Sequence, residues 1–188
     1  PSGAQVSYGV SLQGVPGIII GFNENIAWGV TNVSHDVSDW YRIQWADNQH
    51  TKYSVDGQIR DVQERVEVIG IKGKEARRDT VKYTEWGPVV YDFDPTHPLR
   101  DCALRWISHD QPEPDGSTIF MVLNAGKNYQ DYRAALANYD CPAQNFVFAT
   151  RSGDIAIQVQ GRYPVRAKEQ GRFIQDGSTM ATAWKNFI

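Results

Sequence analysis

The sequence contains few of the residues that build redox and metal centres, and its net charge is small. Its 188 residues include two cysteines and four histidines, with no C-x-x-C or H-x-x-x-H spacing, which argues against a zinc site of closely spaced ligands. The net charge is −3 and the basic residues are scattered, which argues against a nucleic-acid-binding surface. No apolar run reaches the ~20 residues that a membrane-spanning helix needs.

The two cysteines, Cys102 and Cys141, allow one disulfide or none. Free cysteine is among the most buried residue types, so we expect two buried thiols. A disulfide, and with it an oxidising compartment, is the alternative. The chain starts at Pro1 and stops on the apolar Ile188; both ends look cut, so we expect a piece of a larger domain.

Most of the sequence has the pattern of β-strands. Short apolar or alternating segments are bounded by glycine, asparagine and aspartate, which favour tight turns. Short connections between neighbouring segments favour antiparallel pairing. The strands expected in one sheet system span residues 18–22, 26–30, 41–45, 147–149 and 155–159.

One segment, residues 128–138, has the periodicity of an amphipathic helix. Tyr129 and Leu136 lie two helical turns apart among apolar residues at helical spacing. Asn128 precedes them as the expected N-cap. The segment 117–126 fits either a short helix or a strand. The pattern therefore predicts a mostly antiparallel β structure with one clear helix.

No Ser-His-Asp set can be assigned, because all four histidines lie in polar, loop-like segments. A set of longer motifs, however, runs in order through the chain: "GVPGIIIGFNENIAWGVTNVSHDVSDWY", "EWGPVV", "ALRWISHD", "NAGKNYQDYRAAL" and "QNFVFATRSGDIAIQVQGRYPVR". Each motif alone is weak. As an ordered set, over about residues 14–177, they resemble the front and middle of the β-chain of the penicillin acylase (penicillin amidase) family.

The resemblance implies an N-terminal nucleophile hydrolase with an αββα sandwich, so we expect an α+β fold, mostly antiparallel β with few helices. Residues 1–188 are then a single fragment of a larger catalytic domain. In that family a precursor cuts itself to expose a serine at the start of the β-chain, and the serine's own α-amino group acts as base.

The stretches that surround the family's catalytic groups are not in this sequence. The Ser-Asn-x-Trp-type stretch of the nucleophile and the downstream Asn-Asn-x-Pro are both absent, and Ser2 is followed by neither Asn nor Trp. We therefore expect no nucleophile in this chain and no turnover by the fragment alone.

The resemblance also assigns roles to individual residues. It implies that Asn32 supplies a backbone N–H to the oxyanion hole, where catalysis needs a fixed donor aimed at the developing charge. Ile20, Val30 and Phe120 match positions that line the acyl pocket, and Gln144 lies on the pocket side. An apolar lining fits an aromatic or aliphatic acyl group. The alternatives are an ordinary loop asparagine and plain core packing.

The D-x-x-D motif of residues 36–39 resembles the family's calcium site. Asp36 and Asp39 would give carboxylates and Ser38 a backbone oxygen, which suits a hard cation that takes several oxygen ligands. The alternative is a turn residue at Asp36 and a structural acceptor at Asp39. Calcium is the one cofactor expected, and no organic cofactor is.

The implied function is hydrolysis of a linear amide, such as the acyl side chain of a β-lactam or an acyl-homoserine lactone, through a seryl ester. The expected partners are a small-molecule amide substrate and the α-chain of the same precursor, without nucleic acid or membrane, in a bacterial periplasm or outside the cell. One rival interpretation is a stand-alone β-rich binding module for sugar or peptide, using Trp40, Trp45 and Trp86. Another is a structural or interaction domain.

Overall fold

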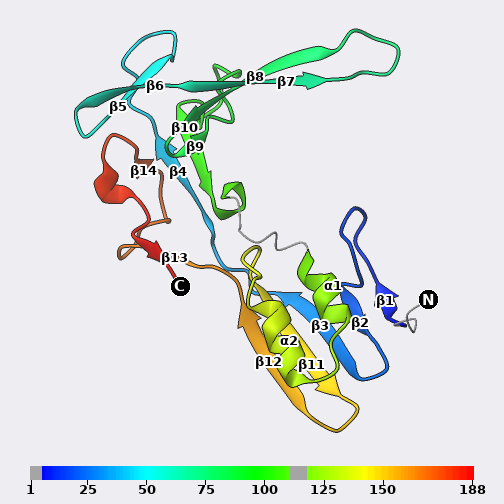
Figure 1. Cartoon of the computed structure of the whole chain (residues 1–188). Coiled ribbons are helices and arrows are strands. Elements are labelled where there is room, and N and C mark those ends of the chain that lie inside the picture. Colours follow the sequence, from blue (N-terminus) through cyan, green and yellow to red (C-terminus); the bar gives the residue numbers. More distant parts are fainter. Residues whose placement is uncertain (1–5, 111–117) are drawn as a thin grey trace. The chain divides into compact units, whose positions relative to one another are not determined.

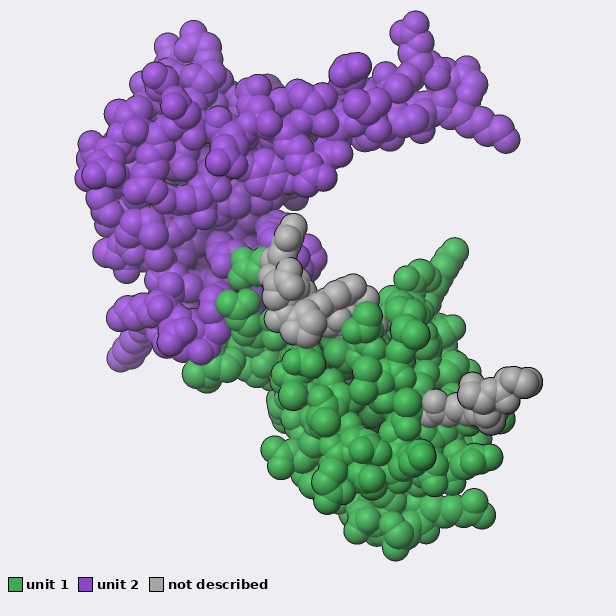
Figure 2. Space-filling view, in the orientation of Figure 1, with its two compact units in different colours: residues 1–35, 110–163, 188 green, residues 36–109, 164–187 purple. Residues whose placement is uncertain are grey.

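The computed structural model describes residues 6–110 and 118–188, and Figure 1 shows its helices and strands. Contacts divide the chain into two compact units, coloured separately in Figure 2. Unit 1 consists of residues 1–35, 110–163 and 188, and unit 2 of residues 36–109 and 164–187. Each unit therefore combines stretches that lie far apart in the sequence.

Unit 1 is built on a five-stranded antiparallel sheet in the order β1-β2-β3-β11-β12. The central pair, β3 and β11, is in register from Ile26 opposite Thr150 to Asn32 opposite Gln144. The five strands are β1 (Tyr8–Val10), β2 (Ile20–Phe22), β3 (Ile26–Asn32), β11 (Gln144–Thr150) and β12 (Ile155–Gln160).

The turn between β2 and β3 is held by the side chain of Asn23. Its Oδ1 accepts hydrogen bonds from the backbone N–H groups of Asn25 at 2.8 Å and Ile26 at 2.9 Å. Its Nδ2 donates to the carbonyl oxygens of Asn124 at 2.9 Å and Gly126 at 2.8 Å. One amide therefore shapes the turn locally and ties it to a segment more than 100 positions away.

Two short helices, α1 (Ile119–Asn124) and α2 (Tyr129–Leu136), cover one face of this sheet. α2 begins where the sequence predicts, because Oδ1 of Asn128 accepts from the backbone N–H of Asp131 at 2.9 Å. α1 resolves the ambiguity of residues 117–126 in favour of a helix, as far as residues 118–126 are described.

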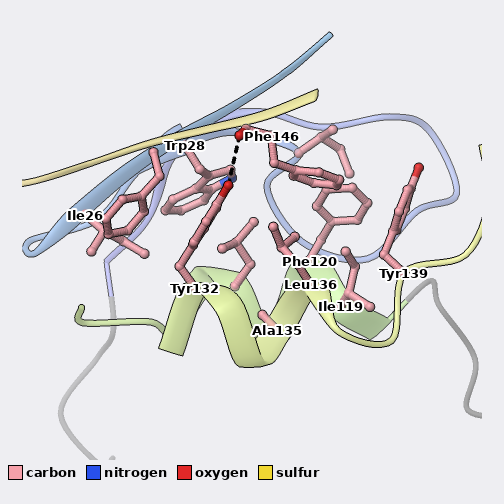
Figure 3. Packing of buried hydrophobic residues seen from close by; sticks show 12 residues of the cluster. Ile26, Trp28, Ile119, Phe120, Tyr132, Ala135, Leu136, Tyr139 and Phe146 are labelled. Atoms are coloured by element: carbon pink, nitrogen blue, oxygen red, sulfur yellow. Dashed lines mark hydrogen bonds between the residues drawn. The ribbon is translucent and has the colours of Figure 1, made fainter. Parts of the chain in front are cut away.

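The helices and the sheet enclose the core of unit 1 (Figure 3). Tyr132 of α2 is fully buried, and its hydroxyl donates to the carbonyl oxygen of Phe146 at 2.9 Å. Its ring lies 4.5 Å from that of Phe148, centre to centre. The other buried members are Ile19, Ile26, Trp28, Ile119, Phe120, Leu123, Ala135, Leu136 and Tyr139. The core is aromatic-rich, and each ring removes a large apolar area from water.

The opposite face of the same sheet is apolar but exposed. The side chains that alternate away from the helices are Tyr8, Val10, Ile20, Phe22, Val147, Ile155, Ile157 and Val159, each between 41% and 84% exposed. Exposed apolar surface of this extent is unusual in a monomeric protein. In an αββα sandwich such a face packs against a second sheet.

Unit 2 contains four small sheets. A three-stranded sheet has the order β10-β4-β14, and another the order β7-β8-β9; β5–β6 and β13–β15 form two-stranded sheets. The strands are β4 (Ser38–Arg42), β5 (Lys52–Val55), β6 (Gln58–Asp61), β7 (Gln63–Ile69), β8 (Arg77–Thr84), β9 (Gly87–Pro88), β10 (Cys102–Trp106), β13 (Pro164–Val165), β14 (Gln175–Asp176) and β15 (Asn186–Phe187). Two 3₁₀ turns complete it, Ile107–His109 and Met180–Thr182.

The core of unit 2 centres on Tyr41, which is fully buried and stacks on Trp86 with ring centres 4.2 Å apart. Burial, and then the negative charge of Asp39, raise the pKa of Tyr41 to about 12. Its hydroxyl donates to the carbonyl oxygen of Thr182 at 2.9 Å. Ile43, Tyr53, Val55, Val89 and Ala103 complete this cluster.

The predicted α+β class, mostly antiparallel β with few helices, is confirmed. The prediction of one sheet system is wrong for residues 41–45: β4 belongs to a different sheet from β3. β4 also pairs in parallel with β14, whereas the sequence favoured antiparallel pairing. Cys102 and Cys141 are free thiols; Cys102 is buried as expected, whereas Cys141 is only partly buried. In the described residues no helix has the length and apolarity to cross a membrane.

Candidate functional site

The residue proposed for the oxyanion hole, Asn32, is the last residue of β3. Gln144, the first residue of β11, lies directly opposite. Nε2 of Gln144 donates to Oδ1 of Asn32 at 3.0 Å. Gln144 is 8% exposed. The two residues are therefore direct neighbours at the end of the central strand pair, and their roles in a site stay predictions.

The main-chain N–H of Asn32 points away from β11. In an antiparallel pair, residues alternate between hydrogen-bonded and non-hydrogen-bonded positions. Val33 donates from its backbone N–H to the carbonyl oxygen of Ala143 at 3.4 Å, and at the other end Arg151 donates to Asn25. Val33 and Asn25 both carry odd numbers, so the odd-numbered residues of β3 occupy the positions that are hydrogen-bonded to β11. Asn32 is even-numbered and therefore occupies a non-hydrogen-bonded position.

On its other side Asn32 lies beyond the reach of β2. The β2–β3 ladder pairs only Trp28 with Gly21 and Ala27 with Phe22. The strand ladders of the sheet therefore leave the N–H of Asn32 unused. A main-chain donor that secondary structure fixes but does not consume is what an oxyanion hole requires.

Neighbouring side chains fix the backbone around this donor. Nδ2 of Asn145 donates to the carbonyl oxygen of Asn32 at 3.3 Å and to Oγ1 of Thr31 at 3.2 Å. Together with the Gln144 bond, three side-chain contacts hold the strand end. The donor is thus positioned in advance, which avoids a reorganisation cost during reaction.

Val30 and Gln144 lie on the helix-covered face of the sheet, and Phe120 belongs to α1, one of the helices that cover it. Val30 packs against the unit 1 core and lies opposite Phe146, whose ring centre is 6.4 Å from that of Phe120. Gln144 precedes Phe146 by two positions and so shares its face. Phe120 and Gln144 are buried at 8% exposure each. Core packing is the role these contacts show for Val30 and Phe120.

Ile20 lies on the opposite, exposed face. Its side chain is 41% exposed and faces the same side as Gly29 and Val147, not the helices. Ile20 and Val30 therefore cannot line the same wall of a pocket within unit 1. The pocket roles of all four residues stay predictions, and Ile20 is the one that faces open space.

The predicted metal loop, residues 36–39, holds an arginine side chain. Nε of Arg166 donates to Oδ2 of Asp39 at 2.8 Å, and its terminal nitrogens donate to the carbonyl oxygens of Asp36 at 2.8 Å and Ser38 at 3.2 Å. Trp184 donates from Nε1 to the same Oδ2. Each of the three residues predicted to bind calcium thus accepts a hydrogen bond from the guanidinium of Arg166.

The donor set of this loop offers few oxygens to a calcium ion. Oδ1 of Asp39 is buried and has no hydrogen-bond partner among the described residues, which is one ligand-like oxygen. The side chain of Asp36, however, is 58% exposed and faces Arg166 at 3.5 Å. Calcium takes 6–8 oxygens, and the described residues contain no cluster of three metal-ligating side chains. The arrangement does not fit the ion while Arg166 is in place.

Arg166 and Trp184, which contact this loop from other segments, are the residues that the sequence did not predict. Arg166 belongs to the "GRYPVR" end of the last motif that carried the family resemblance, so the signal was present. Its partner Asp39 lies 127 positions away, and no spacing rule connects residues so distant.

The tryptophans of the rival binding-module interpretation have internal roles. Trp86 is 3% exposed, and its Nε1 donates to the carbonyl oxygen of Gly177 at 2.9 Å. Trp45 stacks on His50 and donates to Oδ1 of Asp101 at 2.9 Å. Trp40 stacks on a tyrosine ring. These contacts are internal to the fold, and they give the rival interpretation no support.

A shallow hollow of about 540 Å³ opens in unit 2, and no predicted site residue lines it. Its walls are formed by Arg42, Ile43, Gln44, Ile174, Gln175, Asp176 and Ser178.

Comparison with known proteins identifies the family. The family described as Penicillin amidase matches residues 3–188. The chain belongs to the penicillin amidase family. The predicted resemblance, which rested on ordered motifs, is thereby confirmed.

Individual relatives in the penicillin amidase family are similar over most of the chain. Acyl-homoserine lactone acylase QuiP of Pseudomonas aeruginosa is 29% identical over 95% of this chain and 22% of its own length. Penicillin acylase 2 proenzyme of Pseudomonas sp. (strain SE83) is 26% identical over 96% of this chain and 23% of its own length. The chain thus spans under a quarter of these relatives.

A solved structure shows the same fold. Thermostable penicillin G acylase from Alcaligenes faecalis aligns with a TM-score of 0.78 and 21% sequence identity, over 97% of this chain and 34% of that one. At this identity the likeness extends to the fold alone, and it agrees with the α+β class of this penicillin amidase family member.

Proposed function

We propose that this chain is part of an amidohydrolase of the penicillin acylase type, which cleaves a linear N-acyl amide through a seryl ester. Membership of the penicillin amidase family supports the reaction class. The relatives named as acyl-homoserine lactone acylases and as a penicillin acylase support an amide whose acyl group is aliphatic or aromatic.

The observation that carries the proposal is the main-chain N–H of Asn32. It stands at the end of β3, facing away from β11 and beyond the last residue pair of β2. When a serine oxygen attacks the amide carbonyl, the electron pair of the C=O bond moves to oxygen. The N–H of Asn32 donates to that oxyanion, the amine leaves, and water then hydrolyses the seryl ester.

The remaining parts of the proposal concern the whole protein. By family resemblance the nucleophilic serine is no residue of this chain; Ser2 lies outside the described residues. We propose that the protein is made as a precursor, that an α-chain from the same precursor is its partner, and that it works in the periplasm or outside the cell. The word "proenzyme" in the name of one relative supports the precursor.

The test uses the full-length protein and variants at Asn32. Asn32→Ala keeps the main-chain N–H and removes the amide, so we expect kcat to fall less than about tenfold. Asn32→Pro removes the N–H itself, and losing one oxyanion donor typically costs roughly 10²–10³ in kcat. The assay is release of amine from N-acyl-homoserine lactones of several chain lengths and from a chromogenic phenylacetyl amide.

Thr31→Pro is the matched control, because Thr31 is the neighbouring position and its N–H faces β11. We expect it to lower the melting temperature at least as much as Asn32→Pro does, with a smaller loss of kcat per folded molecule. Equal losses of kcat in Asn32→Ala and Asn32→Pro would contradict the main-chain role. A folded, processed protein that cleaves none of the amides would contradict the reaction class.

A further inference from the structure

The loop of residues 36–39 presents its oxygens to one point, and the guanidinium of Arg166 lies there. Its three nitrogens reach the carboxylate of Asp39 and the carbonyl oxygens of Asp36 and Ser38 at 2.8, 2.8 and 3.2 Å. Arginine offers five N–H donors in a rigid planar fork. The fork satisfies backbone and side-chain acceptors together, which a point-like ammonium cannot do in the same way.

This arginine is built into the fold. The side chains of Arg166 and Asp39 are 12% and 1% exposed. Two guanidinium groups lie over the ring of Trp184, whose centre is 4.7 Å from the Cζ atom of Arg105 and 5.4 Å from that of Arg166. Arg105 is the strand partner of Asp39. Two cations and an aromatic face therefore surround the single buried carboxylate.

This arrangement disfavours the binding of a divalent cation. It would need the oxygens that Arg166 already holds, and it would stand beside two positive side chains. Asp36 is the second carboxylate of the loop, and its side chain is mostly exposed. The remaining carboxylate oxygen, Oδ1 of Asp39, is buried beside Gly171, and the described residues add no cluster of three metal-ligating side chains around it.

We propose that Arg166 is the resident cation of this loop: the protein uses a side chain where the D-x-x-D motif suggests calcium, and its fold does not depend on that ion. The same geometry predicts a gain of function. Removing the guanidinium leaves two backbone carbonyl oxygens and the Asp39 carboxylate facing one vacated space, and hard oxygen donors of this kind suit Ca²⁺.

The test is calcium-dependent thermal stability of the full-length protein, independent of catalysis. The protein is stripped with a chelator, and the melting temperature is measured with added CaCl₂ or MgCl₂ up to millimolar concentrations. A ligand that binds only the folded state raises the melting temperature. We expect no calcium shift for the unchanged protein. We expect a lowered melting temperature for Arg166→Met, raised again by several degrees with CaCl₂ but not with MgCl₂.

Arg151→Met is the matched control, because it removes an exposed arginine from the β11–β12 turn; it should change neither value. Arg166→Lys covers the case in which Arg166→Met does not fold. Lysine keeps the charge but loses the planar fork, so we expect an intermediate melting temperature and no calcium shift. A calcium shift in the unchanged protein that Asp39→Asn abolishes would overturn the proposal and make calcium the resident ion.

Discussion

Replacing Tyr132 tests how the core of unit 1 is held together. The side chain is fully buried, and its hydroxyl donates to the carbonyl oxygen of Phe146 at 2.9 Å. Tyr132→Phe removes this bond and leaves the ring, so we expect a loss of about 1 kcal/mol in the free energy of unfolding. Tyr132→Ala also empties the ring's place beside Phe148, and aromatic-to-alanine changes in cores cost about 3–5 kcal/mol.

The stability difference between the unchanged protein and Tyr132→Phe should also depend on pH. Burial, and then the neighbouring Tyr129, raise the pKa of Tyr132 from 10.0 to about 12. A group whose pKa is raised by folding stabilises the fold below its ordinary pKa, and this contribution is lost as the pH rises through the folded value. The stability advantage of the unchanged protein over Tyr132→Phe should therefore be full at pH 8 and shrink between pH 10 and 12.

The assay is urea unfolding of the full-length protein, monitored by circular dichroism, with slopes compared between variants to confirm that the same surface unfolds. A Tyr132→Phe loss as large as that of Tyr132→Ala would refute the assignment of most stability to ring packing. A constant gap across the alkaline range would refute the assigned pKa.

Two further predictions concern local contacts in unit 2. Gly87→Ala should destabilise the protein severely, because Gly87 has φ of +114° and an added Cβ would lie 2.2 Å from the carbonyl oxygen of Leu104. Gly153→Ala is the control: Gly153 has φ of +102° with nothing within 4 Å, so the change should cost only about 1 kcal/mol in the free energy of unfolding. Equal drops in melting temperature for the two variants would contradict this prediction. Burial raises the pKa of Asp92, but hydrogen bonds, above all that from Lys82, lower it further, so the net shift is downward. Asp92→Asn should therefore lower the melting temperature at pH 7. The difference in melting temperature between the unchanged protein and the variant should vanish as the pH falls below about 4 and through the folded pKa. A difference that stays the same from pH 7 down to pH 2 would contradict the ionic contribution.

Local signals in the sequence predicted local structure well. The N-cap at Asn128 and the strands at residues 147–149 and 155–159 each depend on residues within a few positions of one another, and all are present. The short apolar segment at residues 117–126 stayed ambiguous, because a helix and a buried strand of that length share one hydrophobic pattern.

The sequence predicted that residues 26–30 and 147–149 share a sheet, but it did not predict which residues pair. The pairing of Asn32 with Gln144 joins strands more than 100 positions apart, and periodicity alone cannot specify which strands pair. The parallel pairing of β14 with β4 rests on two short segments without a strand-like pattern. The Arg166 contacts follow from tertiary packing, which decides whether a carboxylate meets a metal or a guanidinium.

The interleaving of the two units has a consequence for how the chain is made. A ribosome releases residues in order, and unit 1 needs both residues 1–35 and residues 110–163. Its central strand pair cannot close until β11 has left the exit tunnel, by which time the first segment of unit 2 is already outside. β3 therefore stays unpaired, with its apolar side chains exposed to water, while residues 36–109 of unit 2 are synthesised. Such a chain gains from chaperones that shield waiting strands, and no single cut can separate it into two self-sufficient pieces.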